Sequence, residues 1–228
     1  MTSLSARGIL FDMDGTLVDS TVVVEGVWAE FASDYGLELR DVLAVSHGRR
    51  TADTVALLAP AGTNAEAVGL SIVDKERQRT EGVVEIPGAA AFANALPEEL
   101  VGLVTSAPGD LAKIRMDAAG VHFPRVTVFG EDVANGKPAP DCYLLGARML
   151  GLDPGDVVVF EDAPAGIAAA LAAGMRTVVV GGYNGPEAQG LPRIADYTDV
   201  RATPSTDPDG TVRLTITLDS TADAEWSR

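Results

Sequence analysis

Two aspartates, Asp12 and Asp14, stand on either side of a single methionine and are followed directly by Gly15 and Thr16. Glycine lets the backbone curl at such a point, because it has no side chain to restrict its conformation. With that curl, Asp12 can act as a nucleophile and as a metal ligand, while Asp14 reaches the oxygen of a leaving group. The spacing therefore indicates group-transfer chemistry carried out by carboxylates.

Three later segments carry groups suited to a phosphate and a divalent ion. Thr105 and Ser106 offer hydroxyl and amide donors to phosphate oxygens, and Lys137 supplies a single fixed cation. Glu161 and Asp162 are hard oxygen ligands of the kind that Mg²⁺ prefers. A phosphate monoester and an aspartate nucleophile repel each other, so that a cation and a lysine are needed to offset their charge.

Short apolar runs rich in β-branched residues precede these segments, and helix-like stretches lie between the later runs. Runs this apolar are typical of strands buried on both faces of a parallel sheet. The alternation predicts an α/β fold with a doubly wound parallel sheet, in which ligands bind at the carboxyl edge. The expected strands are 8–11, 100–104, 157–160 and 177–180, with a weaker one at 126–129, and the expected helices are 109–119, 140–150 and 164–173.

The first and second expected strands are separated by a long stretch without a comparable strand. Residues 20–86 instead show helical periodicity, and we expect an inserted helical cap there, with residues 1–19 and 87–228 as the core. The charged run 74–77 is expected to be the solvated face of a helix. One apolar stripe of the insertion consists of Val24, Val27, Trp28, Phe31 and Tyr35.

The end of the chain shows the alternation of an amphipathic strand. Apolar and polar residues alternate over 212–218, after the turn signal Asp209-Gly210. This pattern predicts an edge hairpin. The last ten or so residues are expected to fray, as chain ends commonly do.

The amino-acid composition limits the kinds of molecule that the protein is expected to bind. The chain has 33 acidic and 17 basic residues, a formal net charge of −16, and 46% hydrophobic residues. A folded protein this acidic is a poor binder of nucleic acid and of anionic membrane surfaces. The single cysteine, Cys142, excludes an intrachain disulfide, and no apolar run approaches the roughly 18 residues of a membrane span. We expect a cytoplasmic protein, as a monomer or weak homodimer.

The four motifs, taken in order, resemble those of the haloacid dehalogenase superfamily. They read DMDGT, TS after an apolar strand, GKPAPDCY and VVFEDAPAG. The resemblance extends from residue 8 to about 185, and each motif alone is weakly specific whereas the ordered set is highly specific. It implies a Rossmann-like core with an α-helical cap inserted between the first and second motifs.

The resemblance also assigns roles. It implies catalysis by Asp12, Asp14, Thr105 and Lys137, with an aspartyl phosphate on Asp12 between two displacements. Mg²⁺ would be held by Asp12, the backbone carbonyl of Asp14 and Asp162, with Glu161 acting through water. Phosphate-binding positions are expected at Gly15, Thr16 and Ser106.

The cap carries one concentrated cluster of positive charge, in the segment SHGRRT. Gly48 would let this loop approach the core, and Arg49 or Arg50 could fork onto a phosphate or onto sugar hydroxyls. His47 either contacts substrate or braces the loop. Together with LVDST before the cap and EIPG after it, the segment resembles the subfamily of sugar and polyol phosphatases, which includes glycerol 3-phosphatases and 2-deoxyglucose 6-phosphatases. A small phosphorylated sugar or polyol is the expected substrate.

Three alternatives remain open at this point. A dehalogenase would need neither a metal nor a second carboxylate such as Asp14. A sugar-phosphate mutase similar to β-phosphoglucomutase would carry a proton-transferring histidine where this chain has Val24. A phosphate-sensing binding module would retain ligand without turnover.

Overall fold

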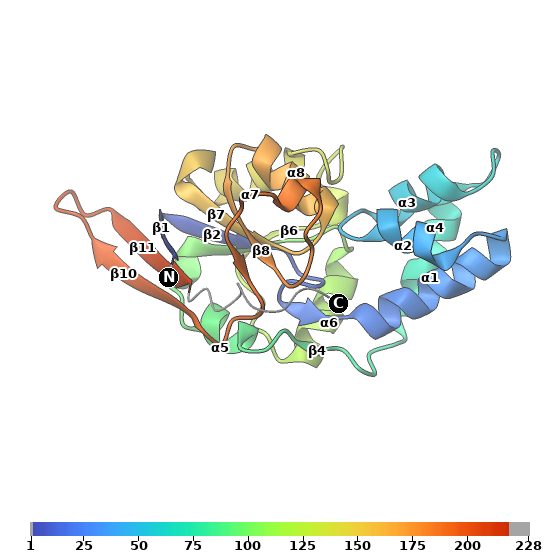
Figure 1. The fold of residues 1–228 in the computed structure, drawn as a ribbon, viewed down its shortest axis with the longest axis horizontal. Helices are drawn as coiled ribbons and strands as arrows, with labels where there is room; N and C mark the ends of the chain where they lie inside the picture. Colours follow the sequence, from blue (N-terminus) through green and yellow to red (C-terminus); the bar gives the residue numbers. More distant parts are fainter. Residues whose placement is uncertain (1, 219–228) are drawn as a thin grey trace.

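The computed structural model describes residues 2–218. A six-stranded parallel sheet lies at its centre (Figure 1). Its middle strands are fully buried, whereas its two outer strands are partly exposed. The predicted α/β fold is confirmed, and each of the five expected strands is present. In spatial order the strands are β6 (Val126–Val128), β5 (Val101–Val104), β2 (Gly8–Phe11), β7 (Val157–Glu161), β8 (Arg176–Val180) and β9 (Arg193–Ile194).

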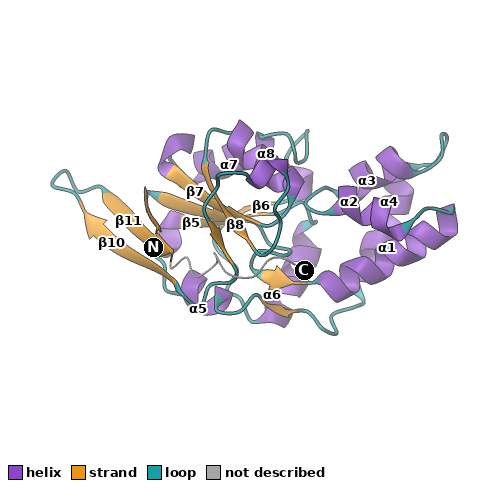
Figure 2. Cartoon of the chain, viewed as in Figure 1, coloured by secondary structure: helices purple, strands orange, loops and turns teal. Residues whose placement is uncertain are grey.

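Helices cover both faces of this sheet, so the core has three layers (Figure 2). Alternate residues of β2 face opposite layers: Phe11 packs with α5 (Ala89–Asn94) and α6 (Gly109–Ala119), whereas Leu10 packs with α7 (Asp141–Leu150) and α8 (Pro164–Ala172). Both faces of each central strand are therefore dry, which explains why the strands read as continuous apolar runs. Short 3-10 turns lie at Glu98–Leu100, Gly130–Asp132, Pro154–Asp156 and Pro186–Ala188.

Four further helices, called the cap below, stand together to one side of the sheet (Figure 1). They pack around Trp28 and Phe31, whose rings meet edge to face, and so the apolar stripe serves as the core of this helical group. The division of the chain into a cap at 20–86 and a core at 1–19 and 87–228 stays a prediction. Its helices are α1 (Thr21–Tyr35), α2 (Leu39–Ser46), α3 (Thr51–Leu58) and α4 (Ala65–Arg77).

A two-stranded ribbon connects the cap to the core. Strands β3 (Val18–Asp19) and β4 (Val84–Glu85) pair antiparallel, with Val18 opposite Glu85. The chain thus leaves for the cap and returns from it side by side. Such a double connection is the usual position for a hinge.

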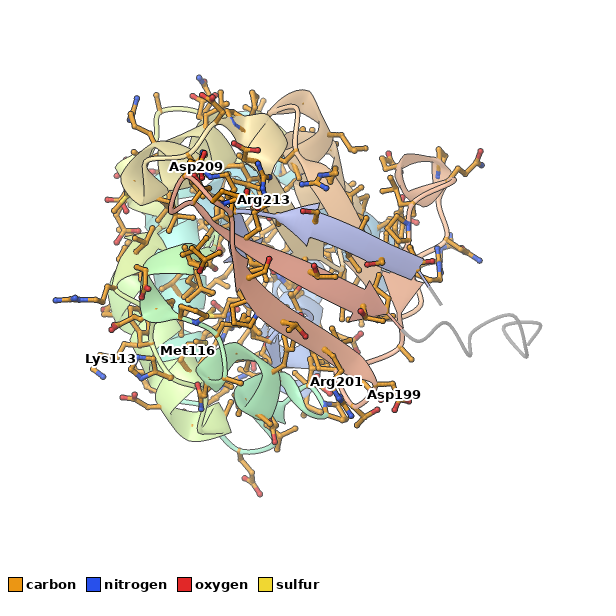
Figure 3. All side chains as sticks on the ribbon, turned by 90° about the vertical axis from the view of Figure 1, so that its left-hand side faces the viewer. Lys113, Met116, Asp199, Arg201, Asp209 and Arg213 are labelled. Carbon is orange, nitrogen blue, oxygen red and sulfur yellow. The ribbon has the colours of Figure 1, made fainter. Side chains whose placement is uncertain are left out.

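The expected hairpin is present, but it does not extend the edge of the parallel sheet. Strands β10 (Val200–Thr206) and β11 (Val212–Leu218) pair with β1 (Thr2–Ala6) in a separate three-stranded sheet. Figure 3 shows this sheet, with Asp209 and Arg213 toward one end and Asp199 and Arg201 toward the other. The apolar face of β11 is buried because Leu214, Ile216 and Leu218 pack into the same apolar cluster as Phe11 and Phe92, while β1 pairs with the edge of β11. The expected fraying concerns residues outside the described range.

Within residues 2–218, no helix combines the length and the apolar character that crossing a bilayer requires.

Candidate active site

The carboxyl edge of the parallel sheet gathers the residues that the motifs single out. Phe11 is in register with Leu103 on one side and with Phe160 on the other. The residues just beyond these positions therefore come together at the edge, and Asp12, Thr105 and Asp162 line one pocket. This is where an open α/β sheet binds ligands.

Lys137 lies beneath the floor of this pocket, with almost no exposure to solvent. Its ammonium nitrogen is 2.5 Å from Oδ1 of Asp12 and 2.7 Å from Oε1 of Glu161, and it also donates to the carbonyl of Val104 at 3.3 Å. Two buried carboxylates thus share one cation. The two ion pairs raise the pKa of Lys137, although burial acts in the opposite direction, so the lysine stays charged.

Glu161 is completely buried and holds Lys137 in place. Its two oxygens accept four hydrogen bonds, including one from the Tyr143 hydroxyl at 2.9 Å and one from the amide of Ala163 at 3.1 Å. A Cβ at Gly166 would lie 1.5 Å from Oε1, so only glycine leaves room for this carboxylate. With its lone pairs engaged in this way, Glu161 is better suited to orienting Lys137 than to binding a metal directly.

Asp12, Glu161 and Asp162 form the acidic cluster of the site, with one oxygen from each lying within 4.8 Å of the others. Burial raises the pKa of Asp12 to about 8, helped by the charge of Glu161 and opposed by Lys137. Burial and the charge of Glu161 likewise raise the pKa of Asp162. The single charge of Lys137 cannot neutralise all three carboxylates. The remaining negative charge on Asp12 and Asp162, away from water, suits a hard divalent cation.

Asp14 faces the same pocket from the turn after β2. Its Oδ1 accepts a 2.7 Å hydrogen bond from the Ser20 hydroxyl. Both of its oxygens lie 2.9 Å from Nη1 of Arg115 on α6. These two partners fix the orientation of the Asp14 carboxylate while leaving it partly exposed to the pocket.

The cap closes the pocket from the other side. His47, Gly48 and Arg49 line it, and the Ser106 hydroxyl of the core donates to the Gly48 carbonyl at 2.8 Å. Gly48 has a φ of +75°, and a Cβ there would lie 3.0 Å from Cβ of Ala163, so glycine permits this approach. Burial lowers the pKa of His47, although Glu25 and Asp14 oppose the shift.

The structure brings most of the expected site residues together, but not Arg50. Its guanidinium pairs with Asp53 at 2.7 Å and donates to the carbonyls of Val133 at 3.2 Å and Ala134 at 3.3 Å, outside the pocket. Arg50 thus joins the cap to the core. Thr16 is also behind the pocket wall, where its hydroxyl donates to Asp162 at 3.3 Å, while Gly15 lines the pocket.

Two charged residues of the pocket, Glu76 and Arg115, were not found by the motifs. The expectation that the run 74–77 is a solvated helix face is wrong for Glu76, which is buried on α4 beside Ile72 and Val73. Spacing could have shown this, because Glu76 falls on the apolar face of its helix at intervals of three and four. Arg115 occupies the equivalent position on α6, four residues after the buried Leu111 and three after the buried Ala112.

The sequence profile of haloacid dehalogenase-like hydrolases matches residues 6–174. The chain belongs to that family. This confirms the resemblance of the four motifs, and the protein is therefore an enzyme of the haloacid dehalogenase-like hydrolases. Families of this kind host several activities on one fold, so the substrate has to be argued from the site.

Two curated relatives of this haloacid dehalogenase-like hydrolase are named for the removal of phosphate from a polyol ester. Hexitol phosphatase A of Escherichia coli is 41% identical over 78% of this chain and 84% of its own length. Glycerol-1-phosphate phosphohydrolase 2 of Saccharomyces cerevisiae is 38% identical over 77% of this chain and 75% of its own length. These names fit the subfamily of sugar and polyol phosphatases that the segments SHGRRT, LVDST and EIPG resemble.

A solved structure agrees in fold. The crystal structure of a hydrolase from Pseudomonas syringae superposes with a TM-score of 0.73 and 24% identity, covering 83% of this chain and 93% of that one. At this identity the likeness supports the α/β core with its helical insertion and carries no argument about substrate.

Proposed function

We propose that the protein hydrolyses phosphate monoesters of small sugars or polyols in a Mg²⁺-dependent reaction that passes through an aspartyl phosphate on Asp12. The observation that carries this proposal is the placement of Asp12 between Lys137, at 2.5 Å, and the pocket that Asp14 also lines. A nucleophile with a buried cation behind it and an acid-base group beside it meets the requirements of phosphoryl transfer.

In the first displacement, a carboxylate oxygen of Asp12 attacks phosphorus and the ester P–O bond breaks. Asp14 gives its proton to the leaving alkoxide. In the second, water attacks the aspartyl phosphate, Asp14 takes a proton from that water, and the bond between phosphorus and Asp12 breaks. Inorganic phosphate and the alcohol are the products.

Other residues hold the phosphoryl group. The Thr105 hydroxyl accepts a hydrogen bond from the amide of Ala107 at 3.0 Å, and its own hydrogen remains for a phosphate oxygen. The Ser106 hydroxyl is already committed to Gly48, so we assign the phosphate contact of Ser106 to its backbone amide. Mg²⁺, bound by Asp12, Asp162 and the carbonyl of Asp14, would supply positive charge as the charge on the phosphoryl oxygens shifts.

The cap supplies the groups that meet the rest of the substrate. Arg49 and His47 line the pocket, whereas Arg50 is occupied with core carbonyls, so we assign the substrate contact to Arg49. The named activities of the curated relatives, on hexitol and glycerol phosphates, support a polyol phosphate as substrate. Small esters of this kind, in a pocket closed by a cap, are selected mainly by size and hydroxyl pattern.

Phosphate release from a panel of sugar and polyol phosphates, with Mg²⁺ and with a chelator, tests this proposal. We expect turnover that requires the metal and that falls by about three orders of magnitude or more in Asp12→Asn, as for loss of a nucleophile. Acid-quenched wild-type enzyme should carry one phosphoryl group on the peptide that contains Asp12, detected by mass spectrometry. Equal turnover by Asp12→Asn would refute the mechanism.

The same panel separates two of the three alternatives, the mutase and the phosphate-sensing module, from a phosphatase. A mutase would interconvert hexose 1- and 6-phosphates after priming by a bisphosphate and would release little phosphate. Val24 lines the pocket at the place where such mutases carry their histidine, and its aliphatic side chain transfers no proton. A phosphate-sensing module would hold the ester tightly and leave it intact.

A further inference from the structure

Glu76 and Arg115 form a buried ion pair inside the pocket, and the phosphoryl-transfer steps above use neither side chain directly. Nη2 of Arg115 lies 3.2 Å from Oε1 of Glu76, and each side chain is 5% exposed. Glu76 comes from α4 of the cap and Arg115 from α6 of the core, so the pair forms only where these two parts meet. Both residues line the pocket together with Trp28.

The hydrogen bonding of this pair is incomplete. Nη1 of Arg115 is fully engaged, since it lies 2.9 Å from both oxygens of Asp14. Nη2 is buried and, within the described part of the chain, makes no hydrogen bond, because its approach to Glu76 is close but poorly aligned. A buried N–H without an aligned acceptor is costly, and so is a desolvated carboxylate. A ligand group that served both would relieve both penalties.

We propose that Glu76 and Arg115 recognise a hydroxyl group on the carbon chain of the substrate. The hydroxyl donates to the Glu76 carboxylate and accepts from Nη2 of Arg115, so that one neutral group completes both partners. This inference rests on the proposed phosphatase function and adds to it the feature of the substrate that is selected: a hydroxyl near the ester, on the side of Asp14 that Arg115 contacts.

Charge at this place disfavours a second anionic group. Arg115 faces two carboxyl groups, Asp14 and Glu76, so its positive charge is already offset by Glu76 even while Asp14 holds its catalytic proton. A substrate carboxylate or second phosphate would have to enter next to Glu76 without a free cation from this pair. The pair therefore favours polyol phosphates over phosphate monoesters of hydroxy acids, which carry a carboxylate.

Three esters of one carbon skeleton test the proposal: glycerol 1-phosphate, propyl phosphate, which lacks the hydroxyls, and 3-phosphoglycerate, which carries a carboxylate. In Glu76→Ala we expect the ratio of kcat/KM for glycerol 1-phosphate to that for propyl phosphate to fall about 10-fold or more, because a hydroxyl contact is lost. In Glu76→Gln we expect kcat/KM for 3-phosphoglycerate relative to glycerol 1-phosphate to rise about 10-fold, because one negative charge is removed. A relative gain of this kind cannot arise from misfolding.

Glu66→Gln is the matched control, since it removes the same charge from an exposed position of the same helix. It should leave both ratios unchanged. The proposal is overturned if Glu76→Ala slows all three esters by one common factor and Glu76→Gln leaves the acid-to-polyol ratio at the wild-type value.

Calorimetry on Asp12→Asn separates this inference from the proposed function. If the wild type releases phosphate from none of the esters, the phosphatase proposal fails. Selective binding of glycerol 1-phosphate over propyl phosphate, lost on adding Glu76→Ala, would still support hydroxyl recognition by the pair. Equal binding of the two esters before and after that substitution would overturn it.

Discussion

A Cβ atom at Gly15 would lie 2.0 Å from Oδ2 of Asp162. The carboxylate after β7 thus occupies the space that any side chain at residue 15 would need. The backbone of Gly15 has a φ of +81°, which also favours glycine. The turn after Asp12 and the acidic residue after β7 are therefore built against each other, although 146 positions separate Thr16 from Asp162 in the chain.

Gly15→Ala should push Asp162 out of the acidic cluster. We expect Mg²⁺ affinity, measured by calorimetry, to fall about 10-fold or more, as when the orienting contacts of a metal ligand are disturbed. Gly120→Ala is the control, because Gly120 has a similar φ of +68° but a Cβ there would meet no atom of the described residues beyond its chain neighbours within 4 Å. In both variants alanine has to adopt a positive φ, which costs about 1 kcal/mol. Only in Gly15→Ala does the added methyl group also clash with the Asp162 carboxylate. Equal Mg²⁺ affinity in the two variants would contradict this account.

Lys137→Met should remove the cation that Asp12 and Glu161 share. We expect kcat/KM for phosphate release to fall by about two orders of magnitude or more, since a fixed charge beside the nucleophile is lost. The unfolding free energy should drop by about 3–5 kcal/mol, because two buried carboxylates lose their partner. Lys113→Met is the control: Lys113, labelled in Figure 3, is exposed and pairs with Asp117 at 2.9 Å on the same helix. If denaturant unfolding and initial rates are the same in Lys137→Met and Lys113→Met, the contacts of Lys137 with Asp12 and Glu161 contribute neither to stability nor to catalysis.

The gathering of the motif residues at the carboxyl edge of the sheet was predictable because its signals are local. Strands β2 and β5 end directly before Asp12 and Thr105, β7 ends at Glu161, and parallel strands bring their carboxyl ends to one edge. The helical nature of the insertion was predictable from the spacing of Trp28 and Phe31 for the same reason: one face of one helix carries the pattern.

Contacts between distant elements were not predictable from these patterns. Arg50 and Arg49 look alike in the sequence, and only the position of the loop at 130–134 decides that Arg50 reaches core carbonyls. Glu76 and Arg115 become partners only because α4 meets α6. The sequence shows each as a charge on an apolar face, which indicates a buried partner without saying which residue it is.

The pH dependence of metal-free stability should report on Asp12. Its pKa is raised from an ordinary 3.8 to about 8, so the folded protein keeps a proton that the unfolded chain releases. The stability linked to this proton is present below about pH 4 and is lost as pH rises toward 8. The asparagine in Asp12→Asn cannot ionise, so this variant does not lose that stability. In the presence of a chelator, the Tm of Asp12→Asn minus the Tm of the wild type should increase by about 4 °C or more between pH 5 and pH 8.

Asp117→Asn, at an exposed carboxylate, serves as the comparison for this pH series. Its difference in Tm from wild type should stay nearly constant over the same interval. Saturating Mg²⁺ should narrow the gap between Asp12→Asn and wild type at pH 8, because a bound cation stabilises the ionised carboxylate. A gap that shrinks with rising pH in chelator would show that Asp12 is not the group with the raised pKa.

Arg50→Ala should loosen the contact between cap and core. The guanidinium pairs with Asp53 and donates to carbonyls of the segment 130–134, so its loss leaves those carbonyls without their donor from the cap. We expect faster hydrogen exchange in the cap helices and in 130–134 of the substrate-free protein, and a fall in kcat/KM of about 10-fold, because a looser cap excludes water less well. Arg50→Lys should restore little, since an ammonium cannot replace the planar fork. Arg40→Ala is the control, because Arg40 is 88% exposed and pairs only with Asp41 among the described residues. A rise in KM without any change in exchange would instead support the sequence-based prediction that Arg50 contacts the substrate.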